Sequence, residues 1–363
     1  MNLFYASFIP GLQNVIADVL RERLSDVNIH KLLDGAVIFE TETGYDKLNF
    51  FCFNNIFACI DIMEHSEGQA SGGRGALEKH VRAVCNSAVN LFQIANNSKD
   101  ICSFRIVVSD ENTPVSVDNK LRMQAELFIS RHSGLKVNRS LPDTEFWFLY
   151  RKEDGAKTSK HNTSQNFSVF MKRLTLRPSW EKTLHKGELP PPLAWTLCRL
   201  AKLVHSDTVL DPFCGYGSVP DAAMKHFHIT KFIACDNNAK AASFTASRFK
   251  KRKTGDFLLH TCDFNVLPSL IAEKSIDVII TDPPWGNFKK HKDNSFPEKM
   301  FDVFGKLLKN GGACSEVSRA RAVVLYANDE NFLKAVPADF EVNDNIPILL
   351  SGKKAVILVL KKK

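Results

Sequence analysis

The sequence predicts an α/β protein that carries an open, mostly parallel sheet in its carboxyl-terminal half. Short apolar runs in this half have the length and character of buried strands. Four of them lead to an aspartate, namely Asp211, Asp236, Asp263 and Asp282. Ligands of open α/β sheets bind at the carboxyl ends of the strands, so we expect these acids to line a ligand site. Each aspartate alone could equally be a helix cap or a turn former.

The amino-terminal half predicts smaller α+β units. The stretch 4–24 reads as a strand, a tight turn and an amphipathic helix. A strand-like stretch at 35–41, a second helix or buried segment at 47–56 and a strand-like stretch at 57–63 follow, and this strand–helix–strand–helix order suggests a ferredoxin-like unit. The Gly- and Ser-rich stretch 66–75 is a linker by composition. Two helices and three or four strands follow it, up to residue 175.

The turn after the strand-like run 208–210 has the composition of a cofactor site. Asp211 is followed by a tight turn with Gly215 and Gly217, and a helix begins at about Ser218. The glycines let the backbone approach a ligand, and the amino end of a helix favours electronegative groups. A turn with an aspartate and only two glycines leaves less room for a pyrophosphate than GxGxxG does. It suits a cofactor that carries an amino acid.

The next two acids fit the rest of such a cofactor. Asp236 follows Asp211 by 25 residues, close to the spacing at which an acid accepts hydrogen bonds from ribose hydroxyls. Asp263 is followed by Phe264. Its carboxylate can accept from an adenine amine while the phenyl ring packs against the base.

The run IDVIITDPPWG ends the fourth strand in a stiff turn. Residues 276–280 are too short for a helix, and Pro283 and Pro284 prevent continuation of a helix or a strand ladder. The Asp282 side chain and a proline carbonyl offer two acceptors to one planar amine, and Trp285 offers a stacking face. This arrangement suits methylation of an exocyclic amine on a nucleobase. The structural alternative is a turn that only ends the strand.

The motifs DPFCGYG, ACDNN, TCDF and TDPPWG together resemble those of the Rossmann-fold, S-adenosylmethionine-dependent RNA methyltransferases of the UPF0020 type. The resemblance implies S-adenosylmethionine as cofactor and a target base held at the DPPW turn. The catalytic residues that it implies are Asp282, Pro283, Pro284 and Trp285. The cofactor-binding residues that it implies are Asp211, Phe213, Gly215, Gly217, Asp236, Asn237, Asp263, Phe264 and Asp282. The chain departs from the family at Tyr216, where Ser or Thr is common, and at Trp285, where Tyr or Phe is common.

The order of elements in 66–175 resembles a THUMP domain, an RNA-binding module. We therefore predict a ferredoxin-like domain at 1–65, a THUMP domain at 66–175 and a Rossmann-like methyltransferase domain at 176–363. This layout resembles that of the tRNA guanine-N2 methyltransferases.

The net charge of +8 lies where RNA contacts are expected. Residues 1–119 carry a net charge of −6, whereas 120–173 carry +6 and 176–363 carry +8. An excess of this size is also common in proteins that bind no nucleic acid. The motif LTLRPSW resembles a hairpin that precedes the first core strand in the family, and KKHKD follows the DPPW turn. The RNA-binding residues that we predict are Arg131, Lys136, Arg139, Arg177, Lys289 and Lys290.

Cysteine usage predicts a reducing compartment. The nine cysteines form no CxxC pair, so we expect buried free thiols, no disulfide frame and no metal site. The amino terminus lacks the basic start of a signal peptide, and no apolar run reaches the length of a membrane span. We therefore expect a cytoplasmic protein without a membrane segment.

The leading functional hypothesis is methylation of the N2 amine of a guanosine in tRNA by a monomer. A small activating subunit stays open as a further partner. One alternative is a guanine-N2 or adenine-N6 methyltransferase of ribosomal or small nuclear RNA, because DPPW does not separate guanine from adenine. A second alternative is an RNA-binding protein whose methyltransferase domain is a non-catalytic scaffold.

Overall fold

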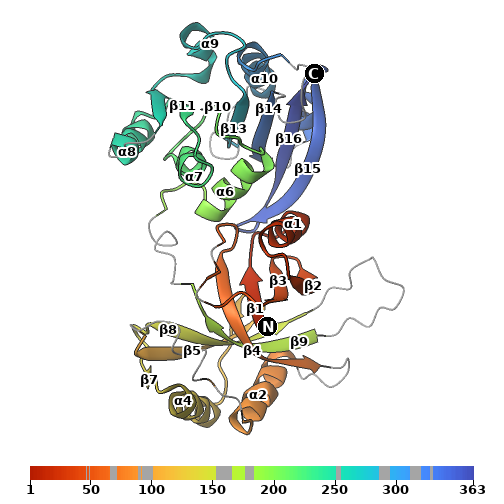
Figure 1. The fold of residues 1–363 in the computed structure, drawn as a ribbon, viewed down its shortest axis with the longest axis vertical. Helices are drawn as coiled ribbons and strands as arrows, with labels where there is room; N and C mark the ends of the chain where they lie inside the picture. The colour runs from red at the N-terminus through yellow and green to blue at the C-terminus, as the bar shows by residue number, and fades with distance from the viewer. Residues whose placement is uncertain are drawn as a thin grey trace, which may run out of the picture. The chain divides into compact units, whose positions relative to one another are not determined.

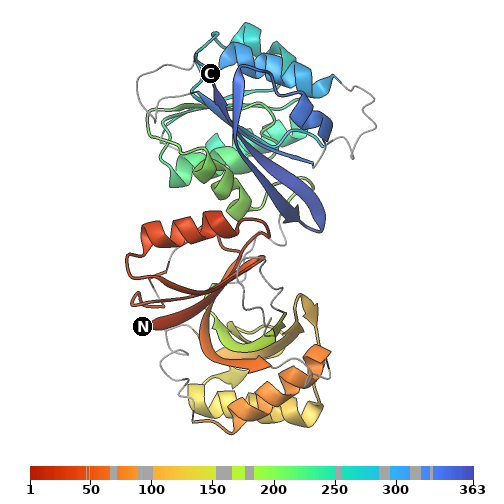
Figure 2. The ribbon, with the colours of Figure 1, turned by 90° about the vertical axis from the view of Figure 1, so that its right-hand side faces the viewer.

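The computed structural model describes residues 1–45, 47–48, 50–65, 72–88, 91, 101–152, 166–175, 184–250, 255–285, 295–310, 320–327 and 330–363. The chain forms two compact units. The first comprises Met1–Phe8 with Leu12–Pro178, and the second comprises Ile9–Gly11 with Ser179–Lys363. Each unit has its own sheet (Figures 1 and 2).

The first unit is a nine-stranded sheet with helices packed on it. The strand order is β2-β3-β1-β4-β9-β8-β5-β6, and β7 pairs with β5. Helices α2 and α4 lie side by side against the part formed by β5, β8 and β9 (Figures 1 and 2). Its elements are β1 (Asn2–Ser7), α1 (Gln13–Arg23), β2 (Asn28–Leu33), β3 (Ala36–Thr41), β4 (Asn55–His65), α2 (Gly72–Cys85), β5 (Ser103–Asp110), β6 (Thr113–Pro114), α4 (Asn119–Ser133), β7 (Lys136–Val137), β8 (Thr144–Arg151) and β9 (Asn166–Arg173).

The predicted boundary at 65/66 does not separate two compact units. Strand β4 ends at His65 and pairs with β9 in register from Phe57↔Arg173 to His65↔Asn166. The predicted ferredoxin-like and THUMP parts thus share one continuous sheet, and their assignment to those two families stays a prediction. Only residues 66–71 of the expected linker lie outside the described residues, since α2 already begins at Gly72.

The second unit is a seven-stranded sheet in the order β12-β11-β10-β13-β14-β16-β15. Strands β10 to β14 are parallel, and β16 and β15 are antiparallel. The predicted Rossmann-like α/β class is therefore confirmed. Its elements are α6 (Pro191–Leu200), β10 (Thr208–Asp211), α7 (Ser218–His226), β11 (Lys231–Cys235), α8 (Ala239–Lys250), β12 (Asp256–His260), η1 (Phe264–Val266), α9 (Leu267–Leu270), β13 (Val278–Thr281), α10 (Phe296–Leu307), β14 (Arg321–Ala327), α11 (Glu330–Lys334), β15 (Phe340–Leu350) and β16 (Lys353–Lys362).

The central strands of this sheet are buried on both faces, as expected for parallel strands covered by helices. Val278, Ile279 and Ile280 of β13 are each 0% exposed. Ile279 lies in one apolar cluster with Met300 and Phe304 of α10. Because the core fixes the strands so firmly, the residues that follow each strand are held at defined positions along one edge of the sheet.

The first unit contains a buried ion-pair network, and its loss should lower the free energy of unfolding. Glu145 of β8 accepts hydrogen bonds from Arg105, from the Trp147 indole at 2.9 Å and from Arg173 at 3.0 Å. Its side chain is 6% exposed and that of Arg173 is 7% exposed. We expect Glu145→Ala to lower the free energy of unfolding by about 3–5 kcal/mol, because it leaves a guanidinium buried without its partner.

Urea unfolding followed by circular dichroism measures this change. Arg21→Ala is the control, because the Arg21–Asp18 pair is exposed and should contribute almost nothing. Equal midpoints for Glu145→Ala and Arg21→Ala would show that the network does not stabilise the unit.

Candidate active site

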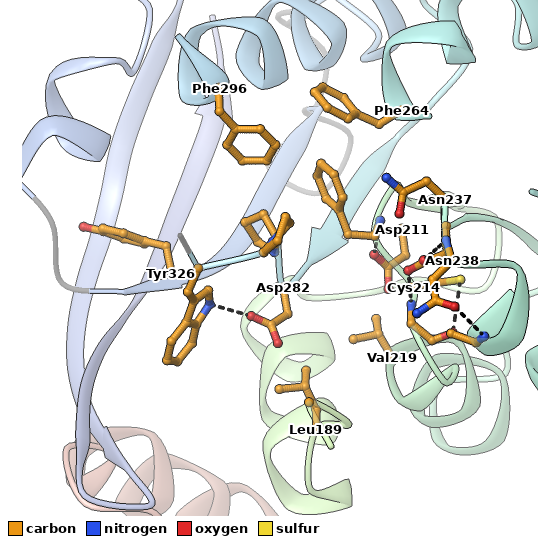
Figure 3. A pocket seen from close by; sticks show the side chains of 18 of the residues that line it. Leu189, Asp211, Cys214, Val219, Asn237, Asn238, Phe264, Asp282, Phe296 and Tyr326 are labelled. Carbon is orange, nitrogen blue, oxygen red and sulfur yellow. Dashed lines mark hydrogen bonds between the residues drawn. The ribbon is translucent and has the colours of Figure 1, made fainter. Parts of the chain in front are cut away.

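The strand order reverses between β10 and β13, and the site lies at that point. Strand β10 pairs with β11 on one side and with β13 on the other, both in parallel. The chain leaves these neighbouring strands in opposite directions, which opens a crevice at their carboxyl ends. A cavity of about 880 Å³ lies there (Figure 3). The four strand-end acids predicted from the sequence all line it, namely Asp211, Asp236, Asp263 and Asp282.

Asp211 joins the two central strands at the base of the cavity. Its side chain is buried, and its Oδ1 accepts hydrogen bonds from the Thr281 hydroxyl at 2.7 Å and from the Phe213 amide at 3.1 Å. Burial raises its pKa to about 7, against the opposing effect of these two hydrogen bonds. Asp211 therefore fixes the end of β10 to the end of β13 and holds the start of the following turn.

The two glycines of this turn have backbone conformations that other residues rarely adopt. The φ angle is +51° at Gly215 and +84° at Gly217. A Cβ at Gly217 would lie 3.0 Å from the side chain of Thr245. The turn is also tied to the neighbouring strand, because the Cys214 amide donates to the Cys235 carbonyl at 2.8 Å.

Asp236 holds the loop after β11. Its Oδ2 accepts from the Gly215 amide at 2.8 Å, and its Oδ1 accepts from the Asn238 amide at 2.8 Å. Each carboxylate oxygen has two lone pairs, so each can accept one further hydrogen bond from a ligand. Asn237 also lines the cavity.

Asp263 is an exposed cap of a short helix as well as a cavity residue. Its Oδ1 accepts from the backbone amide of Asn265 at 2.9 Å and from the Asn265 side chain at 2.7 Å. Phe264 is buried beside it, with ring centroids 5.0 Å from Phe213 and 5.5 Å from Phe296. These three rings form an apolar wall of the cavity, and Figure 3 labels two of them, Phe264 and Phe296.

The DPPW turn forms a further part of the cavity lining. Asp282 directly follows β13, and its Oδ1 accepts a hydrogen bond of 2.8 Å from the Trp285 indole (Figure 3). The pKa of Asp282 is raised to about 8, mainly by removal from water; the indole N–H opposes this rise, and the charge of Asp211 contributes to it. Pro283 and Pro284 also line the cavity.

Tyr216, where the sequence departs from the family pattern, packs at the cavity rim. Its ring stacks on His185 at 4.1 Å between centroids and meets Phe244 edge-on. Its carbonyl accepts from Arg248, which also pairs with Glu188 at 3.1 Å. The bulky ring is thus accommodated against its neighbours at this rim.

Some cavity residues were not predicted from the sequence. Glu188 and Leu189 precede α6, and Tyr326 lies at the end of β14. The end of β14 could have been expected, because it is a further parallel strand of the same sheet. The sequence around Glu188 does not indicate that this residue lines the cavity. Its position there depends on the path of the segment before α6.

The predicted RNA-binding residues have different surroundings. Arg131 and Lys136 are exposed in the first unit. Arg139 donates two hydrogen bonds to the buried Glu126, at 2.9 and 2.7 Å. The other three predicted residues, Arg177, Lys289 and Lys290, lie outside the described residues.

The described part of the chain contains no group of three or more His, Cys, Asp or Glu residues that could hold a metal ion. The eight cysteines within it are free thiols. None of its helices has the length and apolarity needed to cross a membrane.

Comparison with known proteins identifies the family. A model of the UPF0020 family, described as the RMKL-like methyltransferase domain, matches residues 178–344. Over 323 residues the chain is 30% identical to the tRNA (guanine(10)-N2)-dimethyltransferase of Methanocaldococcus jannaschii, covering 82% of this chain and 89% of that protein. The chain belongs to the UPF0020-type RNA methyltransferases of the tRNA guanine-N2 methyltransferase family. The cofactor of this methyltransferase is accordingly S-adenosylmethionine.

More distant relatives agree with this assignment. The methyltransferase is 24% identical over 183 residues to the mouse tRNA (guanine(6)-N(2))-methyltransferase THUMP3, covering 47% of this chain and 35% of that protein. The structure of TrmN from Thermus thermophilus matches with a TM-score of 0.74 at 19% identity and covers 100% of both chains. This second likeness shows a shared fold.

The raised pKa of Asp211 predicts a pH-dependent stability. A carboxyl whose pKa is about 7 in the folded protein, against 3.8 ordinarily, binds its proton more tightly when folded. The free energy of unfolding should therefore fall as the pH rises from about 4 to about 7, and level off above that. Asp211→Asn keeps an oxygen that can accept from Thr281 and Phe213 but does not titrate.

Thermal unfolding of the ligand-free protein across this pH range tests the assignment. We expect Asp211→Asn to gain stability relative to the wild type as the pH rises. Parallel stability curves for the two proteins would show that Asp211 does not titrate in this range.

Proposed function

We propose that this methyltransferase transfers a methyl group from S-adenosylmethionine to the exocyclic N2 amine of a guanosine in tRNA. One observation carries the proposal most directly. The DPPW turn faces the same cavity as Asp211, Asp236 and Asp263, so a target amine at Asp282 and a cofactor at the other acids would share one space. The M. jannaschii relative is named for guanine-N2 methylation of tRNA, which supports the choice of base and RNA.

The cavity residues fit S-adenosylmethionine. Within the described residues, each oxygen of Asp236 accepts one backbone hydrogen bond, which leaves lone pairs for the two ribose hydroxyls. The apolar wall of Phe213, Phe264 and Phe296 suits the adenine ring, with Asp263 close to its amine. The turn with Gly215 and Gly217 suits the methionine part.

The DPPW turn supplies the chemistry of the amine. A guanine amine is a poor nucleophile because its lone pair is delocalised into the ring. Hydrogen bonds from its two N–H groups to Asp282 and to the Pro283 carbonyl would orient the lone pair toward the methyl group. Catalysis would then rest on orientation and electrostatics, with Asp282 accepting the proton that the nitrogen loses after transfer. Bound S-adenosylmethionine supplies a methyl carbon on a positively charged sulfur, which keeps the electron pair of the broken carbon–sulfur bond.

The RNA is proposed to reach the site with its target base out of the stack. A base inside a helix cannot enter a cavity of this kind, so the nucleotide must be extruded. We propose that the exposed Arg131 and Lys136 contact phosphates. The pairing of Arg139 with Glu126 favours a structural role for Arg139 over the phosphate contact predicted from the sequence. Action as a cytoplasmic monomer, with or without a small activating subunit, remains part of the proposal.

The direct test is mass spectrometry of nucleosides from cellular RNA with and without this gene. We expect loss of N2-methylguanosine from the tRNA fraction. Loss of the same nucleoside from small nuclear RNA alone would favour the activity named for a relative that is 26% identical over 120 residues, the bovine U6 snRNA (guanine-N(2))-methyltransferase THUMPD2. Loss of N6-methyladenosine alone would overturn the choice of base.

Substitution of Asp282 should separate chemistry from binding. We expect Asp282→Ala to retain binding of cofactor and tRNA while methyl transfer falls by a factor of about 10² or more, as for the loss of a positioned proton acceptor. Asp282→Asn should be milder, because the amide oxygen still accepts a hydrogen bond. Single-turnover kinetics with radiolabelled cofactor and calorimetry of cofactor binding measure both effects. Transfer that is slower in Asp282→Asn than in Asp282→Ala would contradict this role.

Substitution of Arg131 and Lys136 should weaken binding to any RNA of the same shape. Each alanine variant should lower tRNA affinity and reduce the slope of log affinity against log salt by about 1, since phosphate contacts position the RNA without reading its sequence. Fluorescence anisotropy at several salt concentrations measures the slope. Arg139→Ala is the matched control, for which we expect lower stability and an unchanged slope. Unchanged slopes for Arg131→Ala and Lys136→Ala would place the RNA elsewhere.

A further inference from the structure

The hydrogen bond between Trp285 and Asp282 gives the aromatic residue of the turn a second capability. A stacking face is common to Phe, Tyr and Trp, but an indole also carries an N–H donor. In this chain the Nε1 of Trp285 lies 2.8 Å from the Oδ1 of Asp282 (Figure 3). A phenylalanine ring has no donor for such a bond.

The geometry of the turn favours this contact. Asp282 follows directly on β13, and the rings of Pro283 and Pro284 restrict the backbone between the two partners. The bond occupies one side of the carboxylate at Oδ1. Among the described residues no donor bonds to the other oxygen, Oδ2, whose lone pairs can accept from an incoming group.

We propose that Trp285 is a positioning residue, whose indole N–H orients the Asp282 carboxylate so that Oδ2 meets the target amine. The inference rests on the proposed function, since it assigns a role in the same methyl transfer. In that step the amine nitrogen bonds to the methyl carbon, the carbon–sulfur bond breaks with its electron pair left on sulfur, and a proton leaves the nitrogen for Asp282. Trp285 acts on this step through Asp282.

The charges around Asp282 make the donor important. Asp211, at the end of β10, is the neighbouring acid whose charge raises the pKa of Asp282. Trp285 donates a hydrogen bond to the carboxylate and lowers that pKa. The rest of the cavity lining carries the charged residues Lys186, Glu188, Asp236, Asp263, Glu298, Lys299 and Lys334. Loss of the indole donor should therefore raise the pKa of Asp282 and leave less of it ionised at neutral pH.

The test removes the N–H and keeps the ring. In Trp285→Phe the aromatic face remains but the donor is gone. We expect the rate of methyl transfer at saturating cofactor and tRNA to fall about 10- to 100-fold, the effect of losing a hydrogen bond to a charged group. The Michaelis constant for tRNA should stay nearly constant. The acidic limb of the pH–rate profile should move to higher pH, which a purely structural role would not produce.

A second variant guards against a folding defect in Trp285→Phe. Incorporation of 3-benzothienylalanine at position 285 by nonsense suppression keeps the bicyclic ring and replaces the N–H with sulfur. We expect it to shift the acidic limb as Trp285→Phe does, while cofactor affinity by calorimetry stays at the wild-type value. An unchanged acidic limb with a higher Michaelis constant for tRNA in both variants would overturn the proposal and leave Trp285 as a stacking surface.

A double-variant cycle with Asp282→Asn isolates the interaction. If Trp285 acts through the Asp282 carboxylate, Trp285→Phe should cost much less in the Asp282→Asn background than in the wild type. Equal losses in the two backgrounds would refute the inference. These comparisons need only a methylated product, so they stay valid if nucleoside mass spectrometry shows a base other than guanine, which would overturn the proposed function alone.

Discussion

The site depends on the buried hydrogen bond between the Thr281 hydroxyl and the Asp211 carboxyl. It joins the last residues of β10 and β13, the two strands between which the sheet reverses its order. From Asp211 the chain turns to Gly215, which binds Asp236, and from Thr281 it passes directly to Asp282. The proposed cofactor side and the proposed target side of the cavity therefore both start at this one contact. The Oδ1 of Asp211 accepts from this hydroxyl and from the Phe213 amide together, so one oxygen fixes both the strand ends and the start of the turn.

The sequence was sufficient to locate the strand ends. An apolar run indicates a buried strand, and the aspartate after the run marks where that strand ends. Asp236 and Asp282 were found in this way, and each lies at the cavity. The sequence could not show which side chains form hydrogen bonds with one another. The indole bond of Trp285 and the pairing of Arg139 with Glu126 depend on side-chain directions that a linear pattern does not contain.

The first unit shows the same limit at the level of the sheet. Strands β1, β3, β4, β5, β8 and β9 were expected from composition and all form, whereas β2 was not expected. The second helix or buried segment expected at 47–56 has no helix among its described residues. The pairing of β4 with β9, however, joins segments about a hundred residues apart, and local periodicity carries no information on such partners. The Glu145 network also joins side chains of β5, β8 and β9. Its buried charges can pair only when these strands are neighbours in the sheet. Composition marked a linker at 66–75, but that label could not show that the strands on either side share one sheet.

Asp211 and Asp282 both have raised pKa values, so the electrostatic surroundings in the cavity decide whether Asp282 is ionised. Two neighbouring carboxyls that are removed from water resist ionisation, and the charge on one raises the pKa of the other. Only an ionised Asp282 can accept a proton from an amine, so the cavity needs a favourable positive charge or donor close by. The indole of Trp285 is a permanent donor of this kind, and the positive sulfur of the proposed cofactor would act in the same direction. In the proposed reaction, methyl transfer would remove that positive charge as the amine gives its proton to Asp282, so the two charge changes would offset each other within one cavity.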